Sequence, residues 1–278
     1  MLRHMSIPKE NRVVTLASEI VYGQRSEWCG ATYRPLKLSL MRSRQFFEYD
    51  RKEKLPLIIW LCGGGFTTMD RNVWIPELAW FAKRGYAVAS VEYGTTCRTR
   101  FPEQLEDIKA AIRFLRAHAK EYNLDPERFA LAGESAGGYL SLLAGVTGEN
   151  QEYKTGGYEE FPENVQAVVA FYPVTKPSEM DFCPELVPVP PDFKQYPDIM
   201  NLLKDECPPT MLLHGDTDTQ VPPRQSEELY RALTDRGIQA ECCILEGAEH
   251  ADEPFIQEET KHMVLEFLNK HLKKEGRQ

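Results

Sequence analysis

The sequence predicts an α/β fold with a mostly parallel central sheet flanked by helices. Short apolar runs alternate with helical patterns through most of the chain, whereas the first fifty residues contain two strand-like segments without a helix between them. In addition, one apolar run ends in the pentapeptide GESAG at 133–137 and leads directly into a helical segment. Strand–helix alternation of this kind is typical of sheets built with right-handed crossovers.

The expected strands are short and apolar enough to be buried on both faces of a sheet. The first two, 12–23 and 35–43, have no helix between them, so we expect them to pair antiparallel at one edge of the sheet. Six further runs are predicted to follow: Leu55–Cys62, Tyr86–Tyr93, Arg128–Gly133, Val165–Val174, Pro209–Gly215 and Ala240–Gly247.

Two helices are marked by the spacing of their apolar residues. In the segment 101–122 these residues recur at three- and four-residue steps and form one stripe, made of Leu105, Ile108, Ile112, Leu115 and Ala119. The last long segment, 252–274, carries Phe255, Met263, Phe267 and Leu268. It ends in two lysines, which suits the C-terminus of a helix.

One long segment interrupts the alternation. Residues 176–209 hold eight prolines together with Phe182, Phe193 and Tyr196. A loop of that length inside a compact domain is usually a lid or a binding loop, so we expect a small lid insertion here. The sequence contains no repeat, low-complexity tract or domain-sized linker, and we predict a single domain over 1–278.

Composition and charge exclude several functional classes. The net charge is -9 and no cluster of Lys and Arg is present, so we expect neither a nucleic-acid partner nor a membrane partner. The longest apolar run, LPLIIWLCGGG, is too short to span a bilayer, and the N-terminus lacks the apolar core of a signal peptide. The seven cysteines are odd in number and form no C-x-x-C pair. We therefore expect reduced thiols in a cytoplasmic protein, with no disulfide framework and no metal site.

Ser135 is the candidate nucleophile. The pattern G-x-S-x-G between a buried strand and a helix is typical of a sharp turn that lifts the serine hydroxyl above the sheet. The glycines are needed because the turn forces the serine into strained φ/ψ and flanking Cβ atoms would clash. The same turn aims the N–H of Ala136, at a helix N-terminus, toward an oxyanion formed nearby. The pentapeptide alone is a weak pattern, but this context favours a catalytic role.

A serine hydroxyl requires a base that takes its proton. Of the six histidines, His250 follows the predicted last strand and precedes the final helix, where the chain order Ser…Asp/Glu…His places the base. His214 ends a strand, and we expect a structural role there. The imidazole also needs a carboxylate. The segment HGDTDTQVPP offers Asp216, which could simply cap the turn, and Asp218, farther out on the loop. We prefer Asp218 and keep Asp216 as the alternative.

The segment LCGGGF at 61–66 is the candidate oxyanion loop. It follows a predicted strand, and its three glycines present N–H groups that a substrate can approach without side-chain obstruction. A glycine run can also cradle phosphate. However, neither G-x-x-x-x-G-K-[ST] nor G-x-G-x-x-G is completed here, so we do not expect a nucleotide site.

With these segments in place, the chain resembles the α/β-hydrolase superfamily, in the esterase/lipase branch that carries an HGGG-type oxyanion loop. It is similar to hormone-sensitive-lipase-like esterases and to the bacterial acetyl-xylan/feruloyl-esterase-like group over about Leu55 to His271. The motifs that carry the resemblance include CGGGF, LAGESAGG, HGDTDTQVPP and GAEHAD. The family pattern D-x-x-V-P selects Asp218 over Asp216. The resemblance implies an α/β-hydrolase fold with Ser135 as nucleophile, Asp218 as acid, His250 as base, and Gly64, Gly65 and Ala136 as oxyanion donors.

Cys62 departs from the family pattern, because a histidine usually opens the glycine loop at that position. The resemblance implies that this histidine braces the loop, so the departure bears on loop rigidity rather than on the chemistry. We interpret Cys62 as a buried structural thiol rather than a second nucleophile. The extended N-terminal cap helices of hormone-sensitive-lipase relatives are also missing, so a lid would come mainly from 176–209.

The sequence therefore predicts a cofactor-free serine carboxylesterase for small acyl groups such as acetyl, with a carbohydrate or another small alcohol as leaving group. Phe66, Tyr139 and Tyr172 are candidate pocket residues, although packing is the simpler interpretation of each. One alternative is a prolyl-oligopeptidase-like peptidase or amidase, for whose accessory propeller the chain has no room. Another is a non-catalytic ligand-binding protein, a class that typically lacks a triad member. The sequence makes no prediction of oligomeric state.

Overall fold

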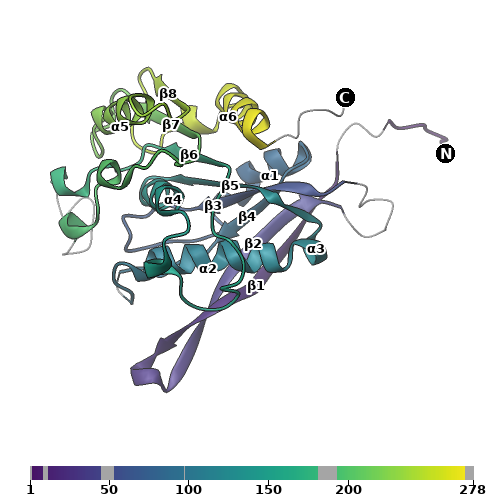
Figure 1. Cartoon of the computed structure of the whole chain (residues 1–278). Coiled ribbons are helices and arrows are strands. Elements are labelled where there is room, and N and C mark those ends of the chain that lie inside the picture. Colours follow the sequence, from purple (N-terminus) through teal and green to yellow (C-terminus); the bar gives the residue numbers. More distant parts are fainter. Residues whose placement is uncertain (1, 9–11, 45–52, 97, 181–192, 273–278) are drawn as a thin grey trace.

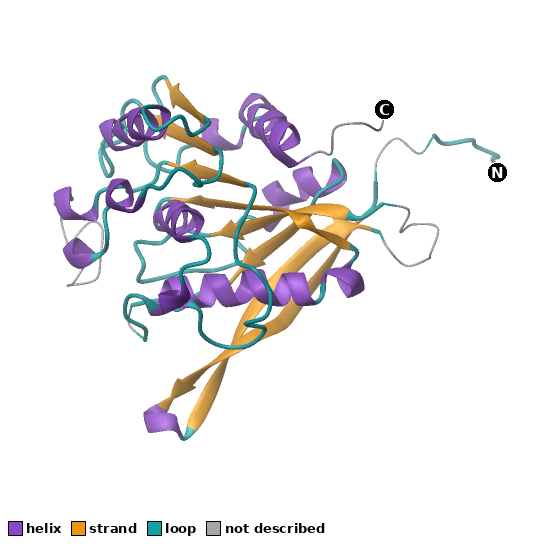
Figure 2. Cartoon of the chain, in the orientation of Figure 1, coloured by secondary structure: helices purple, strands orange, loops and turns teal. Residues whose placement is uncertain are grey.

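The structure, a computed structural model, describes residues 2–8, 12–44, 53–96, 98–180 and 193–272. Its centre is an eight-stranded sheet with the strand order β1-β2-β4-β3-β5-β6-β7-β8 (Figures 1 and 2). β1 pairs antiparallel with β2 and β2 with β4, while the other neighbouring pairs are parallel. The strands are β1 Val14–Glu27, β2 Thr32–Ser43, β3 Leu55–Leu61, β4 Ala87–Val91, β5 Leu124–Glu134, β6 Ala167–Phe171, β7 Thr210–Gly215 and β8 Ala240–Leu245.

Helices cover both faces of this sheet. On one face the hydrophobic core includes α2 (Glu103–Ala117), α4 (Ala136–Thr147) and α5 (Arg224–Thr234). On the other face it includes α1 (Ile75–Lys83) and α6 (Glu258–Leu272). The shorter helices are α3 Ala119–Tyr122, η1 Trp28–Gly30, η3 Gln151–Tyr153, η4 Pro177–Glu179, η5 Phe193–Gln195, η6 Ile199–Leu202 and η7 Glu253–Ile256. β3, β4, β6 and β7 are buried along their whole length, which explains why they are mostly apolar.

The predicted fold class is confirmed, including the antiparallel strands at one edge. The main differences concern element ends. β5 begins at Leu124, four residues before the expected strand. The predicted helix over 101–122 is divided at His118, whose φ of -95° and ψ of 12° end α2 and precede α3. The final segment opens with η7, and α6 begins only at Glu258.

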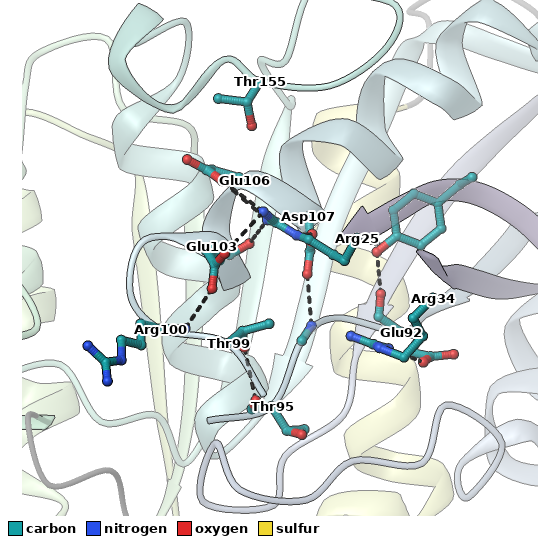
Figure 3. A network of polar contacts seen from close by, with 12 residues as sticks. Arg25, Arg34, Glu92, Thr95, Thr99, Arg100, Glu103, Glu106, Asp107 and Thr155 are labelled. Atoms are coloured by element: carbon teal, nitrogen blue, oxygen red, sulfur yellow. Dashed lines mark hydrogen bonds and ion pairs between the residues drawn. The ribbon is translucent and has the colours of Figure 1, made fainter. Parts of the chain in front are cut away.

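The β1–β2 hairpin extends beyond the rest of the sheet (Figure 1). β2 pairs with β4 only from Leu38 to Met41. The end of the hairpin that lies before Leu38 in β2, together with the part of β1 paired to it, therefore projects past the end of β4. We call this projecting end the hairpin arm. Arg25 fastens this arm to α2, because its guanidinium lies 2.6 Å from Asp107 and 3.2 Å from Glu106 (Figure 3). Asp107 also accepts the N–H of Gly94 at 2.9 Å. The ion pairs of Arg25 therefore hold the hairpin arm on α2, and the hydrogen bond from Gly94 holds the loop after β4 on the same helix.

The predicted lid at 176–209 is described in part. Its stretch 181–192 lies outside the described residues. In the remainder, Phe193 and Tyr196 are buried against the protein. The lid and the single-domain organisation stay predictions. None of the helices in the described ranges combines the length and the apolar character needed to cross a membrane.

Candidate active site

Ser135 lies at the turn between β5 and α4 and has a φ of 53° and a ψ of -119°. A positive φ is strained for a residue with a side chain. The flanking glycines allow this turn to pack tightly. A Cβ on Gly133 would lie 2.5 Å from the carbonyl oxygen of Gly137, and a Cβ on Gly137 would lie 2.1 Å from that of Leu61. The glycines of the motif are therefore required by the close approach of β3, β5 and α4.

His250 connects the three predicted catalytic side chains. Its Nε2 lies 2.9 Å from Ser135 Oγ, and its Nδ1 lies 2.7 Å from Asp218 Oδ2. In the tautomer that carries a proton on Nδ1, the imidazole donates to Asp218 and accepts the hydroxyl proton of Ser135. His250 follows β8 and Asp218 follows β7, so both come from loops at the carboxyl ends of neighbouring strands.

Asp218 is held by several donors. Its Oδ1 accepts the N–H groups of Gln220 at 2.9 Å and Val221 at 2.8 Å, and its Oδ2 lies 3.3 Å from Nε2 of His214. Burial opposes ionisation of this carboxyl. The hydrogen bonds from His214, His250 and Val221 outweigh it and hold the pKa of Asp218 well below its usual range. The carboxylate is therefore charged wherever His250 acts as a base.

Asp216 and His214, the other polar residues considered in this segment of the sequence, each have partners outside the contact between Asp218 and His250. The carboxylate of Asp216 accepts the N–H of Gly247 at 2.6 Å, so it caps the turn after β8. His214 is fully buried, with Nδ1 2.7 Å from Ser226 Oγ and Nε2 2.9 Å from the carbonyl oxygen of Val221. The geometry thus selects Asp218 as the partner of His250 and makes His214 part of its support.

The glycine loop after β3 forms a tight turn. The carbonyl of Gly64 accepts the N–H groups of Thr67 and Thr68, each at 3.1 Å. Gly64 and Gly65 have φ values of 124° and 59°, and a Cβ on Gly64 would lie 2.2 Å from the carbonyl oxygen of Thr68. The third predicted donor, Ala136, is the first residue of α4, where an N–H has no acceptor within the helix. The predicted donors therefore come from a glycine turn and a helix N-terminus.

Cys62 is buried beside this loop. Its Sγ lies 4.0 Å from Ser90 Oγ. Burial, together with the nearby Glu134 carboxyl, raises the pKa of the Cys62 thiol to about 12. Because the thiolate is the nucleophilic form, this environment supports a structural thiol.

An apolar cavity of about 40 Å³ lies on the α1 and α6 face of the sheet. Its lining includes Trp60, Trp74, Glu134, Phe171, Tyr172 and Phe255. The Tyr172 ring centroid lies 4.7 Å from that of His250 and 4.6 Å from that of Phe255. Of the three candidate pocket residues, Tyr172 therefore does contact the base and line a cavity.

Phe66 and Tyr139, the other candidate pocket residues, do not line this cavity. Their ring centroids lie 5.6 Å apart, and both side chains are buried. Phe66 also packs against Phe193 and Tyr196 of the insertion, at 5.0 and 5.6 Å. The physical reason is that both rings join the core on the α2 and α4 face, opposite the cavity.

Sequence reasoning did not single out Glu134, Trp74 and Phe255. Glu134 lies inside the GESAG motif, but the second position of that pattern is unrestricted and the pattern indicates no role for it. Trp74 and Phe255 resemble ordinary packing residues in a sequence, since only the fold brings them to one cavity.

The comparisons with known proteins concern the family and the fold. The model of the BD-FAE family matches residues 46–233. The chain belongs to the BD-FAE family. The match includes Ser135 and Asp218 and ends before His250. It also confirms the resemblance to the esterase branch of the α/β-hydrolases that the motifs indicated.

Two curated relatives of this BD-FAE protein carry ester hydrolase or esterase names. The probable carboxylic ester hydrolase LipM of Mycobacterium tuberculosis is 30% identical over 194 residues, which cover 64% of this chain and 45% of LipM. Esterase LipQ of the same organism is 28% identical over 198 residues, covering 66% and 47%. The chain thus spans about half the length of the curated relatives it matches.

Solved structures show the same α/β-hydrolase fold. A truncated carbohydrate esterase from gut microbiota superposes with a TM-score of 0.80 at 24% identity, covering 96% of this chain and 99% of that one. Thermogutta terrifontis esterase 2, phosphorylated by paraoxon, gives a TM-score of 0.73 at 22% identity, covering 92% and 94%. At these identities the likeness concerns the fold.

Proposed function

We propose that this protein is a serine carboxylic-ester hydrolase for short acyl groups such as acetyl, with a carbohydrate or another small alcohol as leaving group. The observation that carries the proposal is the continuous contact from Asp218 through His250 to Ser135, at 2.7 and 2.9 Å. The esterase names of the relatives, and the carbohydrate esterase among the structural neighbours, support it.

In the acylation half of the reaction, Ser135 Oγ attacks the ester carbonyl carbon and its proton passes to His250 Nε2. The carbonyl oxygen becomes an oxyanion and is stabilised by the N–H groups of Gly64, Gly65 and Ala136. Asp218 holds Nδ1–H and balances the imidazolium charge. When the bond from carbon to the leaving oxygen breaks, His250 returns its proton to the departing alcohol, and an acyl-serine remains.

Deacylation repeats these steps with water as nucleophile. His250 takes a proton from the water, hydroxide adds to the acyl carbon, and a second oxyanion forms in the same hole. The carbon–Oγ bond then breaks, and His250 protonates Ser135. The free acid leaves and the enzyme returns to its starting state, so no cofactor is consumed.

Other features of the chain support the setting of this reaction. We propose a cytoplasmic location on the basis of the cysteine pattern, and the net charge of -9 favours small-molecule substrates over nucleic acid.

The test is hydrolysis of p-nitrophenyl esters from acetyl to octanoyl by the wild type, Ser135→Ala and His250→Ala. We expect the wild type to turn over the short esters and both variants to fall to near background. An aminoacyl-p-nitroanilide serves as the amide comparison, and turnover comparable with that of the acetyl ester would favour a peptidase instead. Wild type and variants with equal, near-background rates would contradict the proposal.

A further inference from the structure

Glu134 joins the catalytic turn to the glycine loop. It is the last residue of β5 and immediately precedes Ser135, yet its own side chain is buried, with a relative exposure of 8% for the residue. Its Oε1 accepts the backbone N–H of Gly63 and the indole N–H of Trp74, the latter at 3.3 Å. The carboxyl thus reaches from the strand that carries the nucleophile to the first glycine of the loop after β3.

The close fit at Gly63 shows that this contact is built into the local structure. A Cβ on Gly63 would lie 2.5 Å from Glu134 Oε2, so a larger residue at 63 would displace the carboxyl from its present position. The carbonyl of the same peptide, that of Cys62, accepts a hydrogen bond from the hydroxyl of Tyr93 at 2.5 Å. The Cys62 thiol itself is directed to Ser90. Both polar groups of the 62–63 peptide are therefore fixed by side chains.

The same carboxyl is connected to the base. Glu134 interacts with the side chain of Tyr172, and the Tyr172 ring contacts the imidazole of His250. Tyr172 has a φ of 37°, which is strained for a tyrosine, and its N–H donates to the carbonyl of Leu213 at 2.6 Å. Glu134 thereby contacts both the glycine loop and the residue that packs on the catalytic imidazole.

We propose that Glu134 is a positioning residue that fixes the oxyanion hole by accepting the Gly63 N–H. This inference rests on the proposed esterase function. Fixing the 62–63 peptide fixes the start of the turn in which Gly64 and Gly65 present their N–H groups, and misplaced donors lose most of their effect on an oxyanion. The arrangement has a cost, since burial raises the pKa of Glu134 above its ordinary value. A buried acid of this kind persists where its acceptor atoms are needed.

Two substitutions separate the acceptor from the charge and the size. Glu134→Gln keeps an oxygen acceptor at the same reach but removes the charge, and Glu134→Met keeps the length without an oxygen acceptor. We expect Glu134→Met to lower kcat on p-nitrophenyl acetate by about 10²–10³-fold with KM nearly unchanged, because an oxyanion-hole interaction acts in the transition state. Glu134→Gln should stay within about five-fold of the wild type, since it retains the hydrogen bond to Gly63.

Glu258, which is exposed, provides a control for the loss of an indole acceptor. Its carboxylate also accepts an indole N–H, that of Trp80 at 2.8 Å, but at the start of α6 rather than beside the glycine loop. Glu258→Met should therefore leave kcat and KM unchanged. Thermal melts of every variant show that losses of rate are measured on folded protein.

Several outcomes would overturn the inference. Full activity of Glu134→Met would show that the loop needs no acceptor, and equal loss of kcat in Glu134→Met and Glu134→Gln would assign the effect to charge. If Glu134→Met does not fold, Glu134→Asn replaces it, because its amide is one methylene too short to reach Gly63. Equal rates for Glu134→Asn and Glu134→Gln would then overturn the inference.

Failure of the proposed function has a different signature. In that case the wild type itself neither hydrolyses the acetyl ester nor reacts at Ser135 with a fluorophosphonate.

Discussion

Glu134 and Glu163 are both buried carboxylates, and the groups around them differ in kind. Glu163 is fully shielded from solvent and is paired with Lys109 at 3.0 Å and with Arg113. Glu134 accepts hydrogen bonds from the neutral Gly63 N–H and the Trp74 indole among the described residues. A buried carboxylate that is paired with two cations joins the elements that carry those cations. A buried carboxylate with only neutral donors leaves most of the free-energy cost of its desolvation uncompensated.

The Glu163 cluster connects α2 to the segment 148–164. Lys109 and Arg113 also donate to backbone carbonyls of that segment, and Arg116 donates to two more at 2.5 Å each. The carbonyls belong to Gly148, Thr155, Gly157, Pro162 and Asn164. The difference between the two acids shows that burial of a carboxyl group does not by itself indicate a role at the candidate active site. Glu163 connects a loop to a helix, whereas Glu134 accepts a backbone N–H of the glycine loop beside Ser135.

The largest effect that we expect is on the free energy of unfolding of Glu163→Gln, and it tests the contrast between the two acids. Glu163→Gln leaves two buried cations without their anion, so we expect the free energy of unfolding to fall by about 3–5 kcal/mol. The midpoint of thermal unfolding should fall by roughly 5–15 °C. At temperatures where the variant is folded, kcat/KM on the acetyl ester should stay within about two-fold of the wild type. Urea unfolding and ester kinetics on the same samples measure both.

Glu134→Gln should differ from Glu163→Gln in the unfolding assays. It removes an uncompensated charge, so we expect its free energy of unfolding to change by less than about 1 kcal/mol. If Glu134→Gln destabilises the protein as much as Glu163→Gln does, the two acids have the same role and the contrast between them is wrong.

We expect a smaller effect, on kcat/KM, when His214 is replaced. This residue extends the comparison because it is buried and polar, contacts Asp218 and has several partners. His214→Ala removes the Nε2 contacts to Asp218 and Val221. Hydrogen bonds to charged groups contribute about 1.5–3 kcal/mol, so we expect kcat/KM to fall about 10- to 100-fold.

Ser226→Ala is the control for that variant. It removes the partner of Nδ1 while leaving both Nε2 contacts in place, and its effect on kcat/KM should be smaller. If both variants lower stability but leave kcat/KM of the folded protein unchanged, His214 supports only the fold.

The smallest effect is expected at Cys62. With the thiol pKa raised to about 12, iodoacetamide at pH 8 should leave Cys62 unmodified in the folded protein while the exposed Cys29 reacts. Cys62→Ala should keep kcat within about two-fold, because Glu134 rather than Cys62 contacts the Gly63 N–H. Peptide mapping after alkylation checks the first expectation. Rapid labelling of Cys62 with loss of activity would mean that the thiol takes part in the site.

The contact of Ser135, His250 and Asp218 was predictable from sequence because each residue is marked locally. Ser135 lies in a turn that needs its glycines, and His250 and Asp218 lie in loops directly after recognisable strands. Since parallel strands end at one edge of the sheet, the order of the segments was enough to bring these side chains together. Its place on the loop already favoured Asp218 over Asp216, and the family pattern selected it. The structure shows that Asp216 caps the turn after β8 instead.

Other parts of the site and fold depend on contacts that no local pattern reveals. Lys109, Arg113 and Arg116 have the spacing of a solvated helix face, yet the segment 148–164 covers them. Phe66 adjoins the glycine loop in sequence, but its ring packs on the face of the sheet opposite the cavity. Glu134 could not be assigned because the direction of its side chain follows from the strained turn at Ser135.

The most direct test of the central claim is labelling of the folded protein with a fluorophosphonate, followed by intact-mass measurement and peptide mapping. We expect one adduct per chain, located on Ser135, no adduct in Ser135→Ala, and much slower labelling in His250→Ala. An unlabelled wild type, or an adduct located on another residue, would contradict it.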